Sequence, residues 1–264
     1  MMRVWYAAAA LILSQLVATR PNVLAEEPPP AATPKAELPS ADELLSAIDR
    51  NMTFETRRAR IRMVVEGKGR TRSYGMVSYG RGENDTAFEY FEPRREKGTK
   101  MLKLGDELWI YMPSVERVQK ISGHMLRQGM MGSDVSYEDL MESRQLRLQY
   151  AARVTGTGRY DGRPCWLLEM TARSKKIAYP RRKVWVDKET AIPVKQQLFA
   201  LSGKLLKTWT MSEVKQFDGR VFPTRMMIQD HAKKGSRTII RMTDLEFGVK
   251  LRTEVFARRW LERR

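Results

Sequence analysis

From about residue 59 onward, the chain is a series of short apolar segments that alternate with polar residues in a period of two. In the first segment, Ile61, Met63 and Val65 alternate with Arg60 and Arg62. A period of two is typical of a β-strand, whose successive side chains point to opposite faces of a sheet. Such segments recur at a spacing of roughly ten residues, at 76–79, 86–91, 100–104, 108–112, 115–121, 153–157, 165–171, 183–186, 194–200, 204–214, 222–229 and 237–247. The series predicts one antiparallel meander, closed or partly closed as a barrel.

Turn residues separate the predicted strands. They are rich in Gly, Asp and Asn, which favour tight turns, and they include 67–69, 80–85, 105–106, 161–162, 202–203, 218–219 and 234–235. No change in composition divides the series into two parts. We therefore expect one folded domain over residues 40–264, mainly β with short helices.

Two segments have helical patterns instead. Ser40 precedes Glu43 by three residues, which is the spacing of a capping box. Leu44, Leu45 and Ile48 follow at helical spacing, which predicts a helix over 41–52. A second segment, 134–148, has Ser136 three residues before Asp139 and an apolar side, and we expect it to be helical as well.

The N-terminal segment has the features of a secretory signal. Arg3 precedes an apolar run over 4–13, and Val23 and Ala25 are small enough for a cleavage site. The run is too short for a membrane-spanning helix, although an uncleaved anchor remains an alternative. Residues 26–39 hold five of the twelve prolines and predict a flexible linker. We therefore expect a signal peptide over 1–25, a Pro-rich linker over 26–39 and a periplasmic mature protein.

The chain carries a formal net charge of +17. A charge of this sign favours anionic partners, namely nucleic acid, acidic lipid headgroups or an acidic protein surface. Export makes nucleic acid a poor candidate and leaves peripheral membrane contact open. The basic residues occur in short clusters (57–58, 94–95, 175–176, 181–183 and 258–259), which indicate a solvated basic surface.

Catalytic residue types are scarce. His124 and His231 are the two histidines, and neither has a second ligand type at metal spacing, so we expect no metal and no cofactor. Cys165 is the one cysteine and lies in an apolar stretch, which favours a buried side chain. A hydrolase that pairs Cys165 with a histidine is the weakest of three functional hypotheses, and we expect the protein not to be an enzyme.

Several predicted strands are apolar on both faces. In 108–112 one face carries Leu, Ile and Met, while the other carries Trp109 and Tyr111. A sheet with one wet face shows cleaner alternation, and the sixteen methionines suit an interior that repacks around apolar ligands. Helices and ordinary core on the two faces would give the same pattern. As ligand-binding residues we predict Trp109, Tyr111, Trp166, Leu168, Trp185, Trp209 and Met211.

Residues 109–123 read Trp-Ile-Tyr-Met-Pro-Ser-Val-Glu-Arg-Val-Gln-Lys-Ile-Ser-Gly, and 131–140 read Met-Gly-Ser-Asp-Val-Ser-Tyr-Glu-Asp-Leu. These stretches resemble the outer-membrane lipoprotein-sorting (LolA-like) family, in particular the branch encoded beside large periplasm-facing exporters. Further collinear matches lie at 165–170, 183–190, 193–195, 203–208, 217–225 and 256–262. The resemblance extends from about residue 40 to the end of the chain.

The resemblance implies a half-barrel, in which a single strongly curved antiparallel sheet has an apolar concave side under a helical lid. The helix at 41–52 and the segment 131–148 are the lid candidates, and as lid or hinge residues we predict Met130, Met131, Gly132, Asp134, Leu140 and Met141. Gly132 suits a hinge, and Asp134 or Ser136 suits a helix cap. The family's lid-holding cavity arginine aligns with no residue securely, and Arg117 and Arg127 are candidates by position.

The resemblance further implies a monomeric periplasmic carrier, which binds a lipid or lipoprotein acyl chain for transfer towards the outer membrane and makes or breaks no bond. The alternative is an accessory protein that docks on an inner-membrane exporter through its basic surface and carries no lipid.

Overall fold

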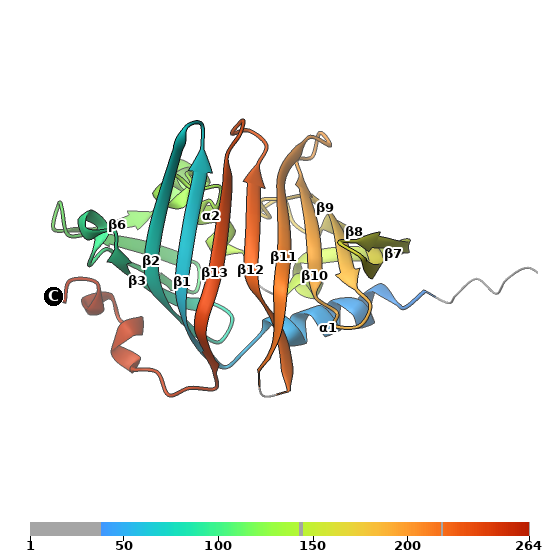
Figure 1. Cartoon of the computed structure of the whole chain (residues 1–264), viewed down its shortest axis with the longest axis horizontal. Coiled ribbons are helices and arrows are strands. Elements are labelled where there is room, and N and C mark those ends of the chain that lie inside the picture. The colour runs from blue at the N-terminus through green and yellow to red at the C-terminus, as the bar shows by residue number, and fades with distance from the viewer. Residues whose placement is uncertain (1–37, 143–144, 218, 264) are drawn as a thin grey trace, which may run out of the picture. The chain divides into compact units, whose positions relative to one another are not determined.

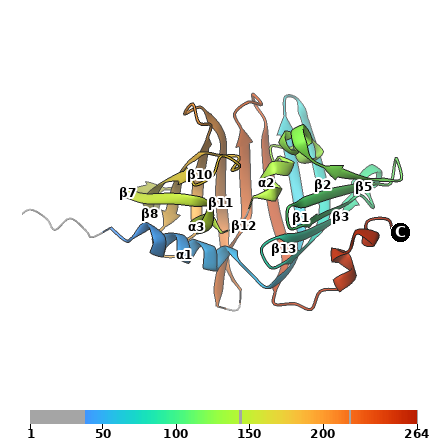
Figure 2. The same ribbon diagram turned by 180° about the vertical axis from the view of Figure 1, so that it is seen from behind.

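The computed structural model describes residues 38–142, 145–217 and 219–263. The predicted signal peptide lies outside these residues, as does all but the end of the predicted linker. The described part forms a 13-stranded antiparallel sheet with its α-helices on one face (Figures 1 and 2). Among the described residues, none of the helices is long and apolar enough to cross a lipid bilayer.

The strands agree with the period-two segments. Most are longer than their segment, β4 and β13 have the predicted bounds, and β6 begins two residues later than predicted because residues 115 and 116 lie in a turn. They are β1 (Thr56–Gly67), β2 (Arg70–Arg81), β3 (Asp85–Glu92), β4 (Lys100–Leu104), β5 (Glu107–Met112), β6 (Arg117–Ile121), β7 (Tyr150–Tyr160), β8 (Arg163–Ala172), β9 (Arg181–Asp187), β10 (Pro193–Phe199), β11 (Leu205–Phe217), β12 (Arg220–Asp230) and β13 (Arg237–Phe247).

The strand order places the two ends of the meander side by side. It runs β6-β5-β4-β3-β2-β1-β13-β12-β11-β10-β9-β8-β7, so β1 pairs with the last strand, β13, in the middle of the sheet. The edge strands β6 and β7 are therefore consecutive in the chain but lie at opposite edges. The sheet is not closed, which confirms the half-barrel and excludes a closed barrel. The segment that joins β6 to β7 must cross one face of the sheet.

This crossing segment is the lid segment (residues 122–142 and 145–149). It contains the 3-10 helices η2 (Gly123–Arg127) and η3 (Met130–Gly132) and the helices α2 (Tyr137–Met141) and α3 (Leu146–Gln149). The helix expected over 134–148 is thus two short helices. The chain becomes extended at Glu142, where its side chain turns to a buried arginine of the sheet.

The first helix, α1 (Ala41–Met52), has the predicted capping box, because Ser40 Oγ accepts from the Glu43 N–H and the Glu43 carboxylate accepts from the Ser40 N–H. Its buried face, Leu44, Leu45 and Ile48, packs on a cluster that includes Leu168 and Val184 of the sheet. From behind, α1, α2 and α3 all lie in front of the sheet, on its concave face (Figure 2).

The C-terminal segment packs on the opposite, convex face. Val255, Phe256, Trp260 and Leu261 form a buried cluster with Ala87, Leu102 and Trp109, which alternate with concave-facing residues along β3, β4 and β5. Strands β3 to β5 are therefore apolar on both faces because protein covers each face. A large empty interior is therefore not needed to explain why these three strands are apolar on both faces.

Candidate functional site

A cavity of about 260 Å³ lies between the concave face of the sheet and the helices that cover it. Most of its lining is apolar. The sheet contributes Ile61, Met63, Met76, Phe88, Leu198, Trp209, Met211, Phe222, Met226, Ile240 and Met242. The lid segment contributes Met130, Val135, Leu140 and Leu146, and α1 contributes Ile48 and Met52. The volume is slightly below the range of ~300–1,000 Å³ typical of small-molecule sites.

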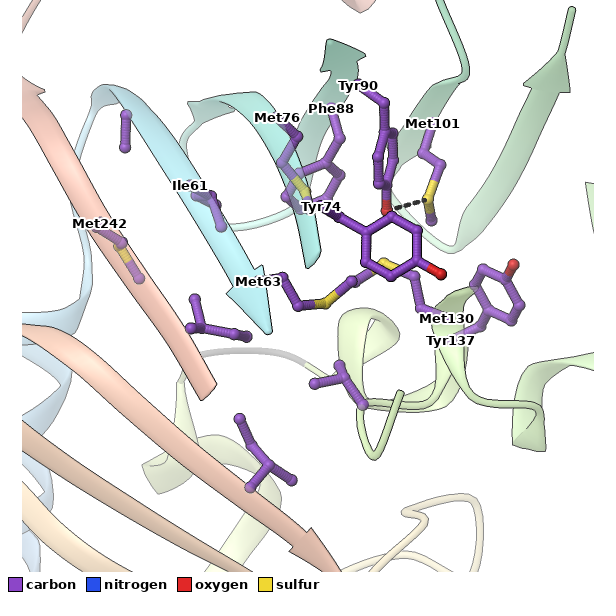
Figure 3. Close-up of a cluster of buried hydrophobic side chains, with 14 of the residues drawn as sticks. Ile61, Met63, Tyr74, Met76, Phe88, Tyr90, Met101, Met130, Tyr137 and Met242 are labelled. Atoms are coloured by element: carbon purple, nitrogen blue, oxygen red, sulfur yellow. Dashed lines mark hydrogen bonds between the residues drawn. The ribbon is translucent and has the colours of Figure 1, made fainter. Parts of the chain in front are cut away.

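The middle part of the lid segment lies on a methionine-rich part of this face. Met130 and Tyr137 approach Met63 and Tyr74 from the opposite side (Figure 3), and all four belong to the largest core cluster. Flexible thioether side chains can rearrange around apolar groups of different shape. This contact between lid and sheet can therefore adapt when its surroundings change.

The middle of the lid segment, at Asp134, is held to the hairpin of β12 and β13. Asp134 is almost completely buried, and its carboxylate accepts from Thr238 Oγ1 at 2.7 Å, Ser236 Oγ at 2.9 Å and the Asp230 N–H at 3.2 Å. Its own N–H donates to Thr238 Oγ1. Asp134 thus anchors the lid segment to the sheet, whereas Ser136 is the N-cap of α2.

The β1–β2 side of the sheet holds the preceding residues. Arg72 Nη2 donates to the Gly132 carbonyl at 3.1 Å, and Tyr74 Oη donates to the Met131 carbonyl at 3.3 Å. Met131 and Gly132 have positive φ angles, which glycine adopts without the strain that a side chain adds. This part of the lid segment is held by hydrogen bonds on both sides.

Two buried ion pairs attach α2 and its C-terminal end to the sheet. Lys207 Nζ of β11 pairs with Asp139, whose other oxygen accepts from Tyr179 Oη at 2.5 Å. Arg182 of β9 donates to Glu142 at 2.5 Å. The Lys207, Asp139 and Arg182 side chains are each less than a tenth exposed. Asp139, Glu142 and Arg182 line the cavity, so these pairs close it on one side.

The electrostatics of these pairs reflect their burial. Burial raises the pKa of Glu142, and the Arg182 guanidinium opposes that rise only in part. The pKa of Arg182 is raised, because the attraction of Glu142 and Tyr150 outweighs the effect of its burial. Burial also raises the pKa of Tyr150, which accepts from Arg182 Nε, to about 12. Removing one partner of such a pair leaves a buried charge without compensation, which is costly.

Helix α1 is joined to the lid segment by Asp49. Its carboxylate accepts from the backbone N–H of Leu146 at 3.1 Å and of Arg147 at 3.4 Å, and so caps the start of α3. Burial raises the pKa of Asp49 despite these hydrogen bonds. Asn51 Nδ2 of α1 donates to the Thr190 carbonyl between β9 and β10. The helices over the cavity are thus connected to one another and to the sheet.

Several solved structures have this arrangement. A DUF1329 family protein from Desulfovibrio piger is 24% identical, with a TM-score of 0.77 over 83% of this chain and 97% of that chain. A domain from Vibrio parahaemolyticus assigned to outer-membrane lipoprotein sorting is 25% identical, with a TM-score of 0.73 over 84% and 98%. A LolA superfamily protein from Nitrosomonas europaea is 22% identical, with a TM-score of 0.70 over 84% and 100%.

A family model described as "-like: Uncharacterized protein" matches residues 82–263, which is more than half of the chain. The chain is a member of the LolA-like family. No curated protein matches the sequence. The family and the fold expected from the motifs at 109–123 and 131–140 are confirmed.

In this LolA-like chain, two of the seven predicted ligand-binding residues, Trp209 and Met211, line the cavity. Trp166 and Leu168 belong to the concave-face cluster that α1 covers and are not among the lining residues. Trp109, Tyr111 and Trp185 point to the convex face. The C-terminal cluster includes Trp109 and Tyr111, and the Lys195 ammonium lies 4.6 Å from the Trp185 ring centroid.

The predicted lid residues all lie in the lid segment. Met130 and Leu140 line the cavity, and Met131 and Met141 pack on the largest core cluster. Gly132 and Asp134 are anchoring points, and the role of Gly132 as a hinge stays a prediction. Arg117 and Arg127 are exposed, whereas Arg57 and Arg182 line the cavity, and Arg182 pairs with Glu142 of the lid segment.

The residues proposed for a hydrolase do not have the environment of a nucleophile. Cys165 is fully buried, and burial raises the pKa of its thiol. A nucleophilic cysteine needs a lowered thiol pKa. His231 Nε2 lies 2.8 Å from Thr208 Oγ1, and His124 is exposed in η2. Among the described residues, no three His, Cys, Asp or Glu side chains are grouped to hold a metal ion.

Proposed function

We propose that this LolA-like protein is a periplasmic carrier, which holds a lipid or lipoprotein acyl chain in the cavity under the lid segment and transfers it towards the outer membrane. The observation that carries the proposal is the apolar cavity between the concave face and a separate cover. An acyl chain gains ~0.8 kcal/mol for each CH₂ removed from water, so about ten carbons would contribute ~8 kcal/mol. The carrier makes and breaks no bond and needs no cofactor.

The cavity volume implies that the cover moves. At about 260 Å³ the space is small for a whole acyl group, and Met130, Val135 and Leu140 of the lid segment form part of its lining. Displacement of α2 would enlarge the cavity without disturbing the strand pairing of the sheet. Opening would separate the Lys207–Asp139 and Arg182–Glu142 pairs, which therefore favour the closed, unloaded state.

The direct test is native mass spectrometry of protein isolated from membranes under mild conditions. A carrier retains lipid, so a fraction of the protein carries the added mass of one or more acyl chains. Extraction with organic solvent then identifies the lipid. Protein that is empty in every preparation, and that takes up no lipid from vesicles, would contradict the proposal.

Neighbouring residues of β13 provide a matched pair of variants. Ile240 lines the cavity, whereas Ile239 points to the convex face. Ile240→Trp fills the cavity, and we expect it to weaken binding of a fluorescent fatty acid about tenfold or more, since it removes most of the apolar burial. Ile239→Trp should bind as the wild type does. Equal binding by both variants would contradict binding of the acyl chain in this cavity.

A further inference from the structure

Three polar side chains form a row across the apolar concave face. The strand register aligns Arg57 of β1 with Gly80 of β2, Gly80 with Thr86 of β3, and Thr86 with Lys103 of β4. Arg57, Thr86 and Lys103 line the cavity, and they are 6%, 8% and 4% exposed. Two cations and a hydroxyl are thus buried side by side at one end of the cavity.

Local packing holds the two cations in place. The Arg57 guanidinium lies 4.7 Å from the centroid of the Phe54 ring, and its Nη2 donates to Ser78 Oγ at 3.5 Å. A Cβ on Gly80 would lie 3.0 Å from the Phe54 ring, so the glycine makes room for this support. Lys103 Nζ donates to the Asn84 carbonyl at 3.1 Å. Both side chains are positioned by the protein.

The charged groups of the cavity are unequal in number and separated in space. Among its described lining residues are three cations, Arg57, Lys103 and Arg182, and two acids, Asp139 and Glu142. Both acids pair with cations of strands β9 and β11, on the other side of the β1–β13 junction. Arg57 and Lys103 are therefore the described cations that line the cavity on the side of β1 to β4.

We propose that this row binds the anionic headgroup, a carboxylate or phosphate, of an amphiphile whose acyl chain occupies the apolar remainder of the cavity. The inference rests on the proposed carrier function and specifies its ligand class. A guanidinium presents a planar fork of donors and an ammonium three rotatable donors, and both suit carboxylate or phosphate oxygens. Hydrogen bonds between ionised partners are about twice as strong as neutral ones.

Three ligands of equal chain length test the headgroup: dodecanoate, dodecyl phosphate and dodecanol. Calorimetric titration of delipidated wild-type protein at pH 8 should give affinities for the two anions that exceed that for dodecanol by about tenfold or more. This comparison needs no variant. Equal affinities for dodecanoate and dodecanol would overturn the headgroup site but leave the carrier function intact. Failure of all three ligands to bind would overturn the carrier function itself.

Two variants locate the site, each with a matched control. Arg57→Gln and Lys103→Met should abolish the preference for the anions, because each variant should lose far more affinity for dodecanoate and dodecyl phosphate than for dodecanol. Arg58→Gln and Lys120→Met alter exposed cations outside the lining, and both should keep the preference. A preference that survives in Arg57→Gln and Lys103→Met would overturn the assignment.

The affinity for inorganic phosphate alone tests whether the row binds the headgroup of a lipid or a free anion. If the row serves an amphiphile, phosphate alone should bind far more weakly than dodecyl phosphate, because the acyl chain supplies most of the burial. Equal affinities for phosphate and dodecyl phosphate would overturn the amphiphile and identify a site for free anions.

Discussion

At the scale of single residues, Asp187 shows how a buried carboxylate holds a turn. It ends β9, and its side chain is 4% exposed. Its Oδ1 accepts from Thr190 Oγ1 and from the backbone N–H of Thr190 and Glu189, and Arg163 lies 3.3 Å from its Oδ2. Burial alone would raise the pKa of Asp187, but these hydrogen bonds outweigh burial and lower the pKa.

The sign of the pH dependence follows from that lowered pKa. The unfolded chain binds this proton more tightly than the folded protein does. The carboxylate therefore stabilises the fold above its ordinary pKa of 3.8, and this stabilisation is lost progressively as the pH falls from that value through the lower pKa of the folded state. We expect Asp187→Asn to lower the free energy of unfolding by ~1–2 kcal/mol at pH 7. The difference from wild type should shrink below about pH 4. Urea unfolding at pH 7 and pH 3 measures both values, and Asp106→Asn, at an exposed turn residue, should show no difference at either pH.

The polar residues of the cavity were missed from the sequence, although a signal for them is present. Arg182 belongs to the basic cluster 181–183, which the sequence analysis assigned to a solvated surface. Yet it shares the period-two phase of Val184 and Val186, just as Lys207 shares that of Trp209 and Met211. A cation in the apolar phase of a strand points inward. The partners of Lys207 and Arg182 are Asp139 and Glu142 of the lid segment, and only the tertiary structure brings these acids next to the strands.

At the scale of single elements, α2 is too short to be stable alone, and its contacts with the sheet decide its position. It has five residues, an N-cap at Ser136 and an ion pair to β11 whose two side chains are each less than a tenth exposed. The connection from β6 at one edge to β7 at the other makes the lid segment cross the concave face. The topology therefore requires a cover over the concave face, and the ion pairs determine how firmly this cover is held closed.

Removal of one charge tests this closure. Lys207→Met leaves Asp139 buried without its cation, and we expect a loss of ~3 kcal/mol in the free energy of unfolding. Adding Asp139→Asn removes the uncompensated carboxylate and should recover much of that loss. Hydrogen exchange should increase over residues 137–141 in the single variant, while the strands stay protected. Lys204→Met, an exposed residue just before β11, should change neither quantity. Exchange that rises equally across the strands would show that Lys207 supports the whole fold and not the lid.

Gly132 provides a second test of the lid segment. An alanine there would adopt φ near +70°, and its Cβ would lie 2.9 Å from the Arg72 guanidinium. We expect Gly132→Ala to cost ~1–2 kcal/mol from the backbone alone, and more if Arg72 loses its bond to the Gly132 carbonyl. Gly203→Ala, with φ +84° and no atom near the added Cβ, shows the backbone cost by itself. Equal losses in thermal unfolding would show that the Arg72 contact contributes nothing.

At the scale of the whole molecule, each face of the sheet is covered by a different segment of the chain. The concave face holds the cavity and the lid segment, and the convex face of β3 to β5 is covered by the C-terminal segment. Trp260 is 4% exposed in that second cluster, and Lys100 Nζ donates to its carbonyl at 3.2 Å. The stability supplied by the C-terminal cluster should therefore be separable from ligand binding on the other face.

Trp260→Ala tests this separation. Truncation of a buried tryptophan costs ~3 kcal/mol or more, so the midpoint of thermal unfolding should fall. At temperatures where the variant is folded, its affinity for a fluorescent fatty acid should equal that of the wild type. A parallel loss of affinity would mean that the convex cluster shapes the cavity through the sheet.

The sequence by itself determined the local structure of this protein. Period-two segments and turn residues located the strands, the Ser40 and Glu43 pair located α1, and motifs identified the family, because these properties depend on residues that are neighbours in the chain. Only the tertiary structure decided which face of each strand lines the cavity. Trp109 and Trp209 look alike in sequence, but the C-terminal segment covers one and the lid segment faces the other. That difference depends on contacts between segments more than a hundred residues apart along the chain, such as Lys100 with Trp260 and Asp134 with Thr238, which are separated by 160 and 104 residues. No local pattern contains such contacts.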